Sequence, residues 1–168
     1  MAFAPVLIIF PICLAYAALN DIKCFKIPNW ISIVLVAVYP IAALACGASI
    51  DLVMQSFLIG AAALLIGFAL FAFNILGGGD AKLFAASALW IGLSGAAPFL
   101  LWLALSGGVL SILILLFRAT PVVPAYVRFD WMMRLHQSEN GVPYGVAIAI
   151  GGFAALPHTA LFGLAFGI

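Results

Sequence analysis

Two aspartates stand where the chain re-enters apolar sequence: Asp21, in the segment NDIKCFKIPN, and Asp80, in the segment GGGDAKL. Acidic residues are scarce here, with five Asp and Glu among 168 residues, so these two positions call for a chemical explanation. Two carboxyl groups held close together can hydrolyse a peptide bond. The ionised group takes a proton from water, while the protonated group supplies one to the carbonyl oxygen or the leaving nitrogen. We therefore treat Asp21 and Asp80 as candidate catalytic residues.

No other set of side chains in the sequence competes with this pair. The cysteines Cys13, Cys24 and Cys46 form no CxxC pair, and His136 and His158 lie in different regions without an acidic neighbour on the expected face. Neither a disulfide framework nor a zinc site is indicated. The two-carboxylate chemistry requires no metal ion, and we expect no metal and no cofactor.

The composition decides the class of protein. Hydrophobic residues make up 68% of the chain and charged residues 7%, against roughly 25% charged residues in ordinary soluble domains. Such a chain cannot cover a globule with polar surface, so we expect an integral membrane protein. The apolar runs are continuous rather than alternating, which favours helices over barrel strands.

The apolar runs have about the length of 17–25 residues that a helix needs to cross a bilayer. We expect an all-α, polytopic transmembrane bundle of about six helices, forming a single integral-membrane domain over residues 1–168 without a separate soluble domain. The one substantial connection is 118–142. Breaks at glycine, proline and charged residues place the spans near residues 3–20, 30–48, 52–76, 81–96, 97–117 and 143–166.

The distribution of charge predicts the orientation. All Lys and Arg residues fall in the first, third and fifth connections, whereas the second and fourth hold only Asp51. By the positive-inside rule the odd connections are cytoplasmic and both termini face outward. Asp21 and Asp80 then share the cytoplasmic face. The basic residues are Lys23, Lys26, Lys82, Arg118, Arg128 and Arg134.

From the local sequence alone, each aspartate could also have a purely structural role. Asp80 follows three glycines, which permit positive φ and close backbone approach, but it also suits a helix N-cap with the glycines as a turn. Asp21 also suits a solvated charge at a helix end. If both are catalytic, the helix dipoles favour an ionised Asp80 as the base and a protonated Asp21 as the acid, although Lys23 opposes this at Asp21.

Four further residues near the pair are candidates for supporting roles. Lys23 and Lys82 suit contacts with lipid headgroups, with electrostatic tuning of the aspartates as the alternative. Pro28 suits the first turn of the second helix, and Asn29 lies beside it, so a structural role is open for both.

The long connection contains the segment 126–135, with the sequence YVRFDWMMRL. This pattern predicts a short helix at the membrane interface, anchored by Trp131 and Arg134. Asp130 and Arg134 are four residues apart, a spacing that allows an ion pair on one helix face. Docking of a substrate on this segment is an alternative role.

Two motifs together resemble the signatures of prepilin peptidases. Asp21 followed after five residues by Ile27-Pro28-Asn29 is similar to the first signature, and Gly77-Gly78-Gly79-Asp80-Ala81-Lys82 is similar to the second, Gly-x-Gly-Asp-x-Lys. The segment 143–145, Pro-Tyr-Gly, resembles a weaker motif that opens the last helix. The resemblance implies Asp21 and Asp80 as the catalytic pair, with Gly77, Gly78 and Gly79 forming the active-site loop.

The resemblance also implies a substrate. An aspartyl endopeptidase of this family, in the bacterial inner membrane, removes the leader of prepilins or pseudopilins at the cytoplasmic face, after a Gly that precedes the hydrophobic pilin helix. The chain lacks the cysteine-bearing insertion of longer relatives, so it looks like the short form that serves Flp-type (Tad) pili, without methyltransferase activity. The implied partners are the prepilin and the bilayer, with no nucleic acid, and the oligomeric state is open.

Two other classes of protein remain as alternatives. A small transporter or channel would use the two acids to bind a cation or relay protons. Against it, the sequence shows no inverted repeat and no acid at mid-membrane depth. A scaffold subunit of a secretion machine would tolerate Asp→Asn at both sites.

Overall fold

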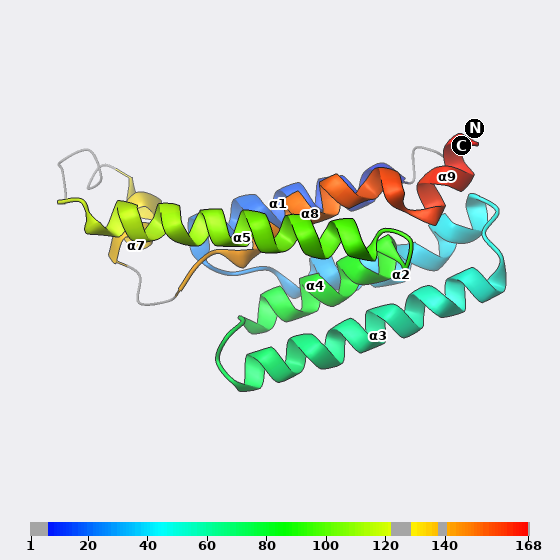
Figure 1. Ribbon diagram of the computed structural model, residues 1–168, viewed down its shortest axis with the longest axis horizontal. Coiled ribbons are helices and arrows are strands. Elements are labelled where there is room, and N and C mark those ends of the chain that lie inside the picture. The colour runs from blue at the N-terminus through cyan, green and yellow to red at the C-terminus, as the bar shows by residue number, and fades with distance from the viewer. Residues whose placement is uncertain (1–6, 122–128, 138–140, 168) are drawn as a thin grey trace.

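The computed structural model describes residues 7–121, 129–137 and 141–167, and within these residues every regular element is a helix. The all-α prediction is therefore confirmed. Figure 1 shows α1 to α5 and α8 side by side along the long axis, with α7 at one end and α9 at the other. The helices are α1 Ile9–Cys24, α2 Asn29–Ala45, α3 Ile50–Ala72, α4 Gly78–Ile91, α5 Ala96–Ala119, α7 Asp130–Gln137, α8 Tyr144–Ala155, the 3₁₀ turn η2 Leu156–His158 and α9 Ala160–Phe166.

The helices coincide approximately with the predicted spans, except that the last span is divided into two helices. The last span is broken between η2 and α9 by a bend of 50°, where Pro157 lies in the 3₁₀ turn and Thr159 caps the next helix. By length and composition α3 and α5 can each cross a membrane. The segment Tyr144–His158 and the helix Ala160–Phe166, taken together across the bend, form a third candidate span. The prediction of six crossings remains a prediction.

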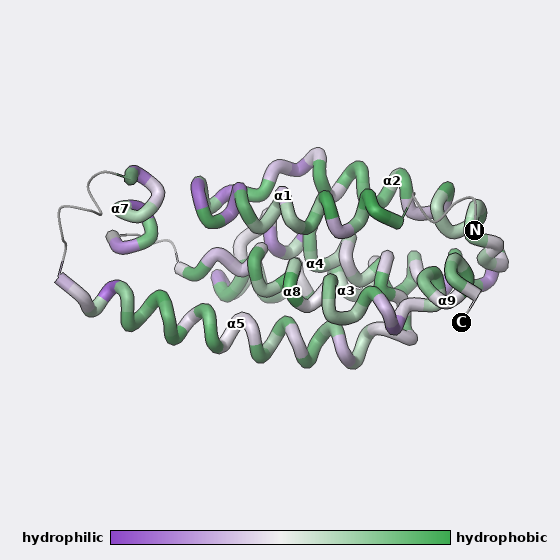
Figure 2. Tube along the Cα trace, turned by 90° about the horizontal axis from the view of Figure 1, so that it is seen from above, coloured by the Kyte–Doolittle hydropathy of each residue, from purple (hydrophilic) through white to green (hydrophobic). Residues whose placement is uncertain are grey.

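The outer surface of the bundle is apolar. In α3 and α5 the most hydrophobic windows are only 22% and 17% buried within the protein, so most of their Leu, Ile and Phe side chains face outward. Figure 2 shows hydrophobic residues along most of the bundle, while α7 carries hydrophilic residues. Side chains of this kind need lipid around them, as expected of a membrane protein.

Helix α4 is the centre of the packing and carries one of the two aspartates. Its side chains are buried from Ala85 to Ile91. Trp90 donates a hydrogen bond from Nε1 to the carbonyl oxygen of Leu35 at 2.8 Å, and its ring stacks on Phe10 and meets Tyr39 edge to face. Because buried aromatic pairs add about 0.5–1.5 kcal/mol beyond their area, this cluster fixes α1 and α2 against α4.

Small residues let neighbouring helices approach closely. A Cβ at Gly67 in α3 would lie 3.2 Å from the backbone of Ala81 in α4, and one at Gly151 in α8 would lie 3.0 Å from the carbonyl oxygen of Phe99 in α5. Close backbone approach of this kind is the usual basis of helix packing within membranes.

Helix α7 confirms the short helix predicted in the long connection, as far as the described residues reach, since 122–128 lie outside them. Arg118, at the end of α5, donates hydrogen bonds to the carbonyl oxygens of Leu135 and Gly141 at 3.0 and 2.8 Å. These bonds fasten α7 and the approach to α8 onto α5. The three cysteines are free.

Candidate active site

Asp21 lies in the last turn of α1 and is buried, with 4% of its surface exposed. The backbone N–H of Gly145, in the first turn of α8, donates a hydrogen bond to Asp21 Oδ2 at 2.8 Å. The first N–H groups of a helix have no partner within the helix and carry its positive dipole end. The alternative of a solvated charge at a helix end is therefore wrong, because Asp21 is held by a second helix.

Asp80 lies in the first turn of α4, but it is not the N-cap. Gly77 occupies the N-cap position with φ −68° and ψ 148°, and Asp80 is the third helical residue. The backbone N–H groups of Gly77 and Gly145 face its carboxyl group and lower its pKa. The alternative of Asp80 as the N-cap is therefore wrong, because Gly77 occupies that position.

The two carboxylates line one cavity of about 610 Å³, and the N–H of Gly145 that Asp21 accepts also lowers the pKa of Asp80. Its wall on the α1 side is shaped by the short connection to α2, where Phe25 has φ 51° and Asn20 Nδ2 donates a hydrogen bond to the carbonyl oxygen of Lys26 at 2.6 Å. The remaining lining residues are Cys24, Ile27, Pro28, Asn29, Gly77, Gly78 and Gly79.

The three glycines are needed for close approach and not for positive φ. None of them lies in the left-handed region, and Asn74, with φ 56°, supplies the left-handed residue of the turn after α3. A Cβ at Gly77 would lie 2.6 Å from Asp80 Oδ2, and one at Gly79 would lie 3.2 Å from Cβ of Ile27. Of the two properties that glycine permits, this loop uses close approach and not positive φ.

The four supporting candidates separate into two groups. Pro28 and Asn29 line the cavity, with Pro28 at the N-cap of α2, one residue earlier than expected. Lys23 and Lys82 do not line it. Lys23 is exposed, and Lys82 Nζ donates a hydrogen bond to Asn29 Oδ1 at 2.9 Å, which joins the first turns of α4 and α2.

Both carboxyl groups are less acidic than usual. Burial raises the pKa of Asp21 from 3.8 to about 6, against the hydrogen bond from Gly145. Burial and then the charge of Asp21 raise the pKa of Asp80 from 3.8 to about 7, against the N–H groups of Gly77 and Gly145. This order is the reverse of the one expected from the helix dipoles, because the charge of Asp21 adds to burial at Asp80.

The Oδ1 atom of Asp80 independently supports a higher pKa for Asp80 than for Asp21. This atom is buried and has no hydrogen-bond partner among the described residues. An unpaired buried oxygen costs less on a neutral carboxyl than on a carboxylate. The arrangement therefore favours an ionised Asp21 and a protonated Asp80.

We predict a bell-shaped pH dependence for any reaction that uses the pair as base and acid. Below about pH 6 Asp21 is protonated and no base remains, and above about pH 7 Asp80 has lost its proton and no acid remains. The specificity constant kcat/KM should therefore be greatest between the two values. A rate that stays level from pH 5 to pH 9 would contradict this pairing.

Sequence reasoning undervalued Gly145. Its segment Pro143-Tyr144-Gly145 was noticed only as the opening of the last helix, yet Gly145 supplies the N–H that Asp21 accepts and that lowers the pKa of Asp80. A Cβ at this position would lie 2.8 Å from Asp21 Oδ2 and 2.9 Å from Ile27 Cδ1. The available signal was a Pro followed two residues later by Gly at a helix start.

Comparison with known families gives one match. The model of the type IV leader peptidase family, peptidase family A24, matches residues 8–112, which include both aspartates. No curated protein matches the chain, and no solved structure matches it.

Proposed function

This chain belongs to the type IV leader peptidase family, whose members are aspartic-type prepilin peptidases, and we propose that it cleaves prepilin leaders with Asp21 and Asp80 as the catalytic pair. The observation that carries the assignment is that both carboxylates line one cavity, with Asp21 held by the backbone N–H of Gly145. The family match favours this function over the transporter and scaffold alternatives.

The proposed reaction needs one ionised and one protonated carboxyl group. Asp21 takes a proton from a water molecule, whose oxygen attacks the scissile carbonyl carbon, while Asp80 donates its proton to the carbonyl oxygen. The tetrahedral intermediate then collapses. Asp21 gives the proton to the leaving nitrogen, and Asp80 recovers its own from the hydroxyl group. Both carboxyl groups end as they began, and one water molecule has been consumed.

The proposed substrate is an Flp-type prepilin or pseudopilin, cut after a Gly that precedes its hydrophobic helix. The cysteines Cys13, Cys24 and Cys46 form no CxxC pair, which supports this assignment, because the longer relatives carry paired cysteines. We accordingly propose peptidase activity without methyltransferase activity.

Purified protein in detergent should release the leader from a purified Flp-type prepilin, as a mobility shift and as a new amino terminus detected by mass spectrometry. The cleavage should survive EDTA, because among the described residues no three His, Cys, Asp or Glu side chains converge to hold a metal ion. Activity that vanishes with EDTA and returns with a divalent ion would replace the two-carboxylate reaction by a metal-assisted one.

We propose that the catalytic cavity opens to the cytoplasm, on the grounds of the positive-inside rule. In a variant without the native cysteines, a membrane-impermeant maleimide added from the periplasm should label Ser49→Cys and spare Thr120→Cys. Both positions are exposed and lie at loops on either side of the predicted bundle. The reverse labelling pattern would place the cavity on the periplasmic face.

A further inference from the structure

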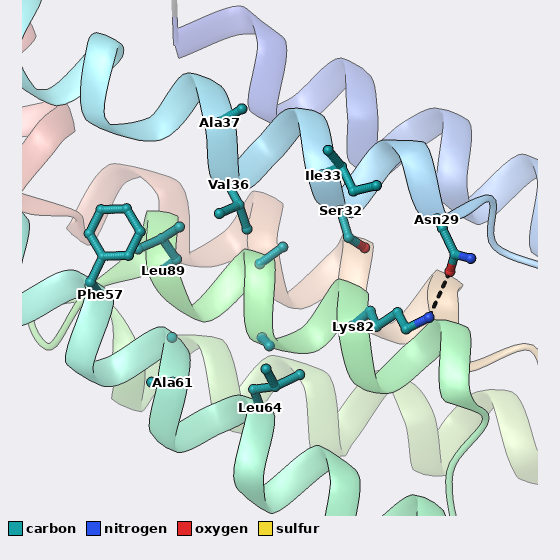
Figure 3. Close-up of a pocket in the computed structure, with 13 residues that line it drawn as sticks. Asn29, Ser32, Ile33, Val36, Ala37, Phe57, Ala61, Leu64, Lys82 and Leu89 are labelled. Atoms are coloured by element: carbon teal, nitrogen blue, oxygen red, sulfur yellow. Dashed lines mark hydrogen bonds between the residues drawn. The ribbon is translucent and has the colours of Figure 1, made fainter.

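A second hollow lies beside the catalytic cavity. It is a groove of about 650 Å³ between α2, α3 and α4, and we call it the lateral groove. Figure 3 shows Asn29 and Lys82 hydrogen-bonded at one end and Phe57 at the other. The remaining lining residues are Ser32, Ile33, Val36, Ala37, Gly60, Ala61, Leu64, Ala85, Ala86 and Leu89.

We propose that the lateral groove binds the hydrophobic helix of the prepilin while the scissile bond occupies the catalytic cavity. This inference rests on the proposed function, since its occupant is the substrate. The two hollows share Asn29 in their linings. A chain that leaves the catalytic cavity past Asn29 therefore enters the groove directly.

The dimensions and the chemistry of the groove fit one face of a helix. From Asn29 to Ala37 along α2 it extends for about two helical turns, or roughly 12 Å at 1.5 Å per residue. The floor holds Gly60, Ala61 and Ala85, and small residues let a second helix backbone come close within a membrane.

Ser32 provides an independent observation that points to a ligand. This residue is 8% exposed, and its Oγ is buried without a hydrogen-bond partner among the described residues. It lines the groove one turn from Asn29, near the end that adjoins the catalytic cavity. The first N–H groups of a helix have no internal partner, and leaving them unpaired is costly in lipid. Oγ of Ser32 can accept one of them where the substrate passes from extended chain to helix.

The third described cavity does not offer an alternative path. It measures about 70 Å³ and is lined by residues such as Tyr39, Trp90 and Ser94. Trp90 lies at the end of α4 that is remote from Asp80, and Ser94 follows that end. A substrate held there could not place a bond between the two carboxylates.

The test compares two neighbouring positions on α3. Ala61 lines the groove and Ala62 does not, and both are exposed. Ala61→Phe should lower kcat/KM for a purified Flp-type prepilin by about tenfold or more, because it overfills the contact, whereas Ala62→Phe should match the wild type. A synthetic peptide that spans the cleavage site but lacks the helix should be cut equally by both variants. Ser32→Ala should raise KM for the prepilin with little change in kcat.

Photo-crosslinking locates the helix independently of turnover. A benzophenone side chain at Leu64, in the groove, should capture the prepilin in an Asp80→Asn background, and one at Leu65, outside it, should not. Capture of lipid alone at Leu64, equal prepilin capture at both positions, or equal prepilin cleavage by Ala61→Phe and Ala62→Phe would overturn the inference. A wild-type protein that cuts no prepilin would instead show that the proposed function has failed.

Discussion

Asp21→Asn and Asp80→Asn should each reduce leader cleavage by about 10²-fold to 10⁴-fold, the range that a positioned acid or base contributes. Each variant removes one half of the proton exchange and leaves the shape of the cavity unchanged. The double variant should be little slower than either single one, because residues that act as a unit are not additive. Initial rates of leader release from a purified prepilin measure the effect.

Stability measurements distinguish a loss of catalysis from misfolding of the variants. The raised pKa values of Asp21 and Asp80 mean that the fold disfavours their ionised forms, so above about pH 7 a neutral Asn should leave the folded state as stable or more stable. Asp51→Asn is the matched control, because Asp51 is exposed in the first turn of α3. Near-normal cleavage by either active-site variant would remove that residue from the proposed pair.

Gly145→Ala should lower cleavage by about 10²-fold, the loss that a misplacement of about 1 Å can cause. The new Cβ would lie 2.8 Å from Asp21 Oδ2 and 2.9 Å from Ile27 Cδ1, so the carboxylate or α8 must shift. Overpacking of this kind also costs about 1–3 kcal/mol of stability. The acidic limb of the pH profile should move as well, because the N–H that favours ionised Asp21 is displaced.

Gly108→Ala is the control for this substitution. Gly108 lies within α5, and a Cβ there meets nothing within 4 Å, so the variant should cleave like the wild type and gain the helix propensity of Ala. If Gly145→Ala keeps both the rate and the pH profile of the wild type, the N–H of Gly145 has no part in holding Asp21.

The sequence was sufficient to predict the helices and to single out the two aspartates as candidates. The reasons are physical. Continuous apolar runs mark membrane helices without any knowledge of partners, because each run satisfies its own backbone hydrogen bonds. Asp21 and Asp80 were conspicuous because acids are rare in such a chain. The all-α fold is confirmed, and their catalytic role remains a prediction that the substitutions above test.

What the sequence could not supply was tertiary context. The acid and base roles were assigned mainly from the dipoles of α1 and α4, whereas burial dominates both pKa values and the charge of Asp21 adds to it at Asp80. Oδ1 of Asp80 and Oγ of Ser32 look ordinary in the sequence. Only the packing of distant helices shows that they are buried and unpaired.

The hydrogen bond from Gly145 to Asp21 also constrains when the enzyme becomes competent. The two residues are separated by 124 positions, and Asp80 is made in between. A nascent chain therefore carries both acidic groups long before the amide of Gly145 has left the ribosome. The proposed site is complete only once α8 has joined the bundle, so a partly synthesised molecule holds both carboxyl groups without the amide that orients Asp21.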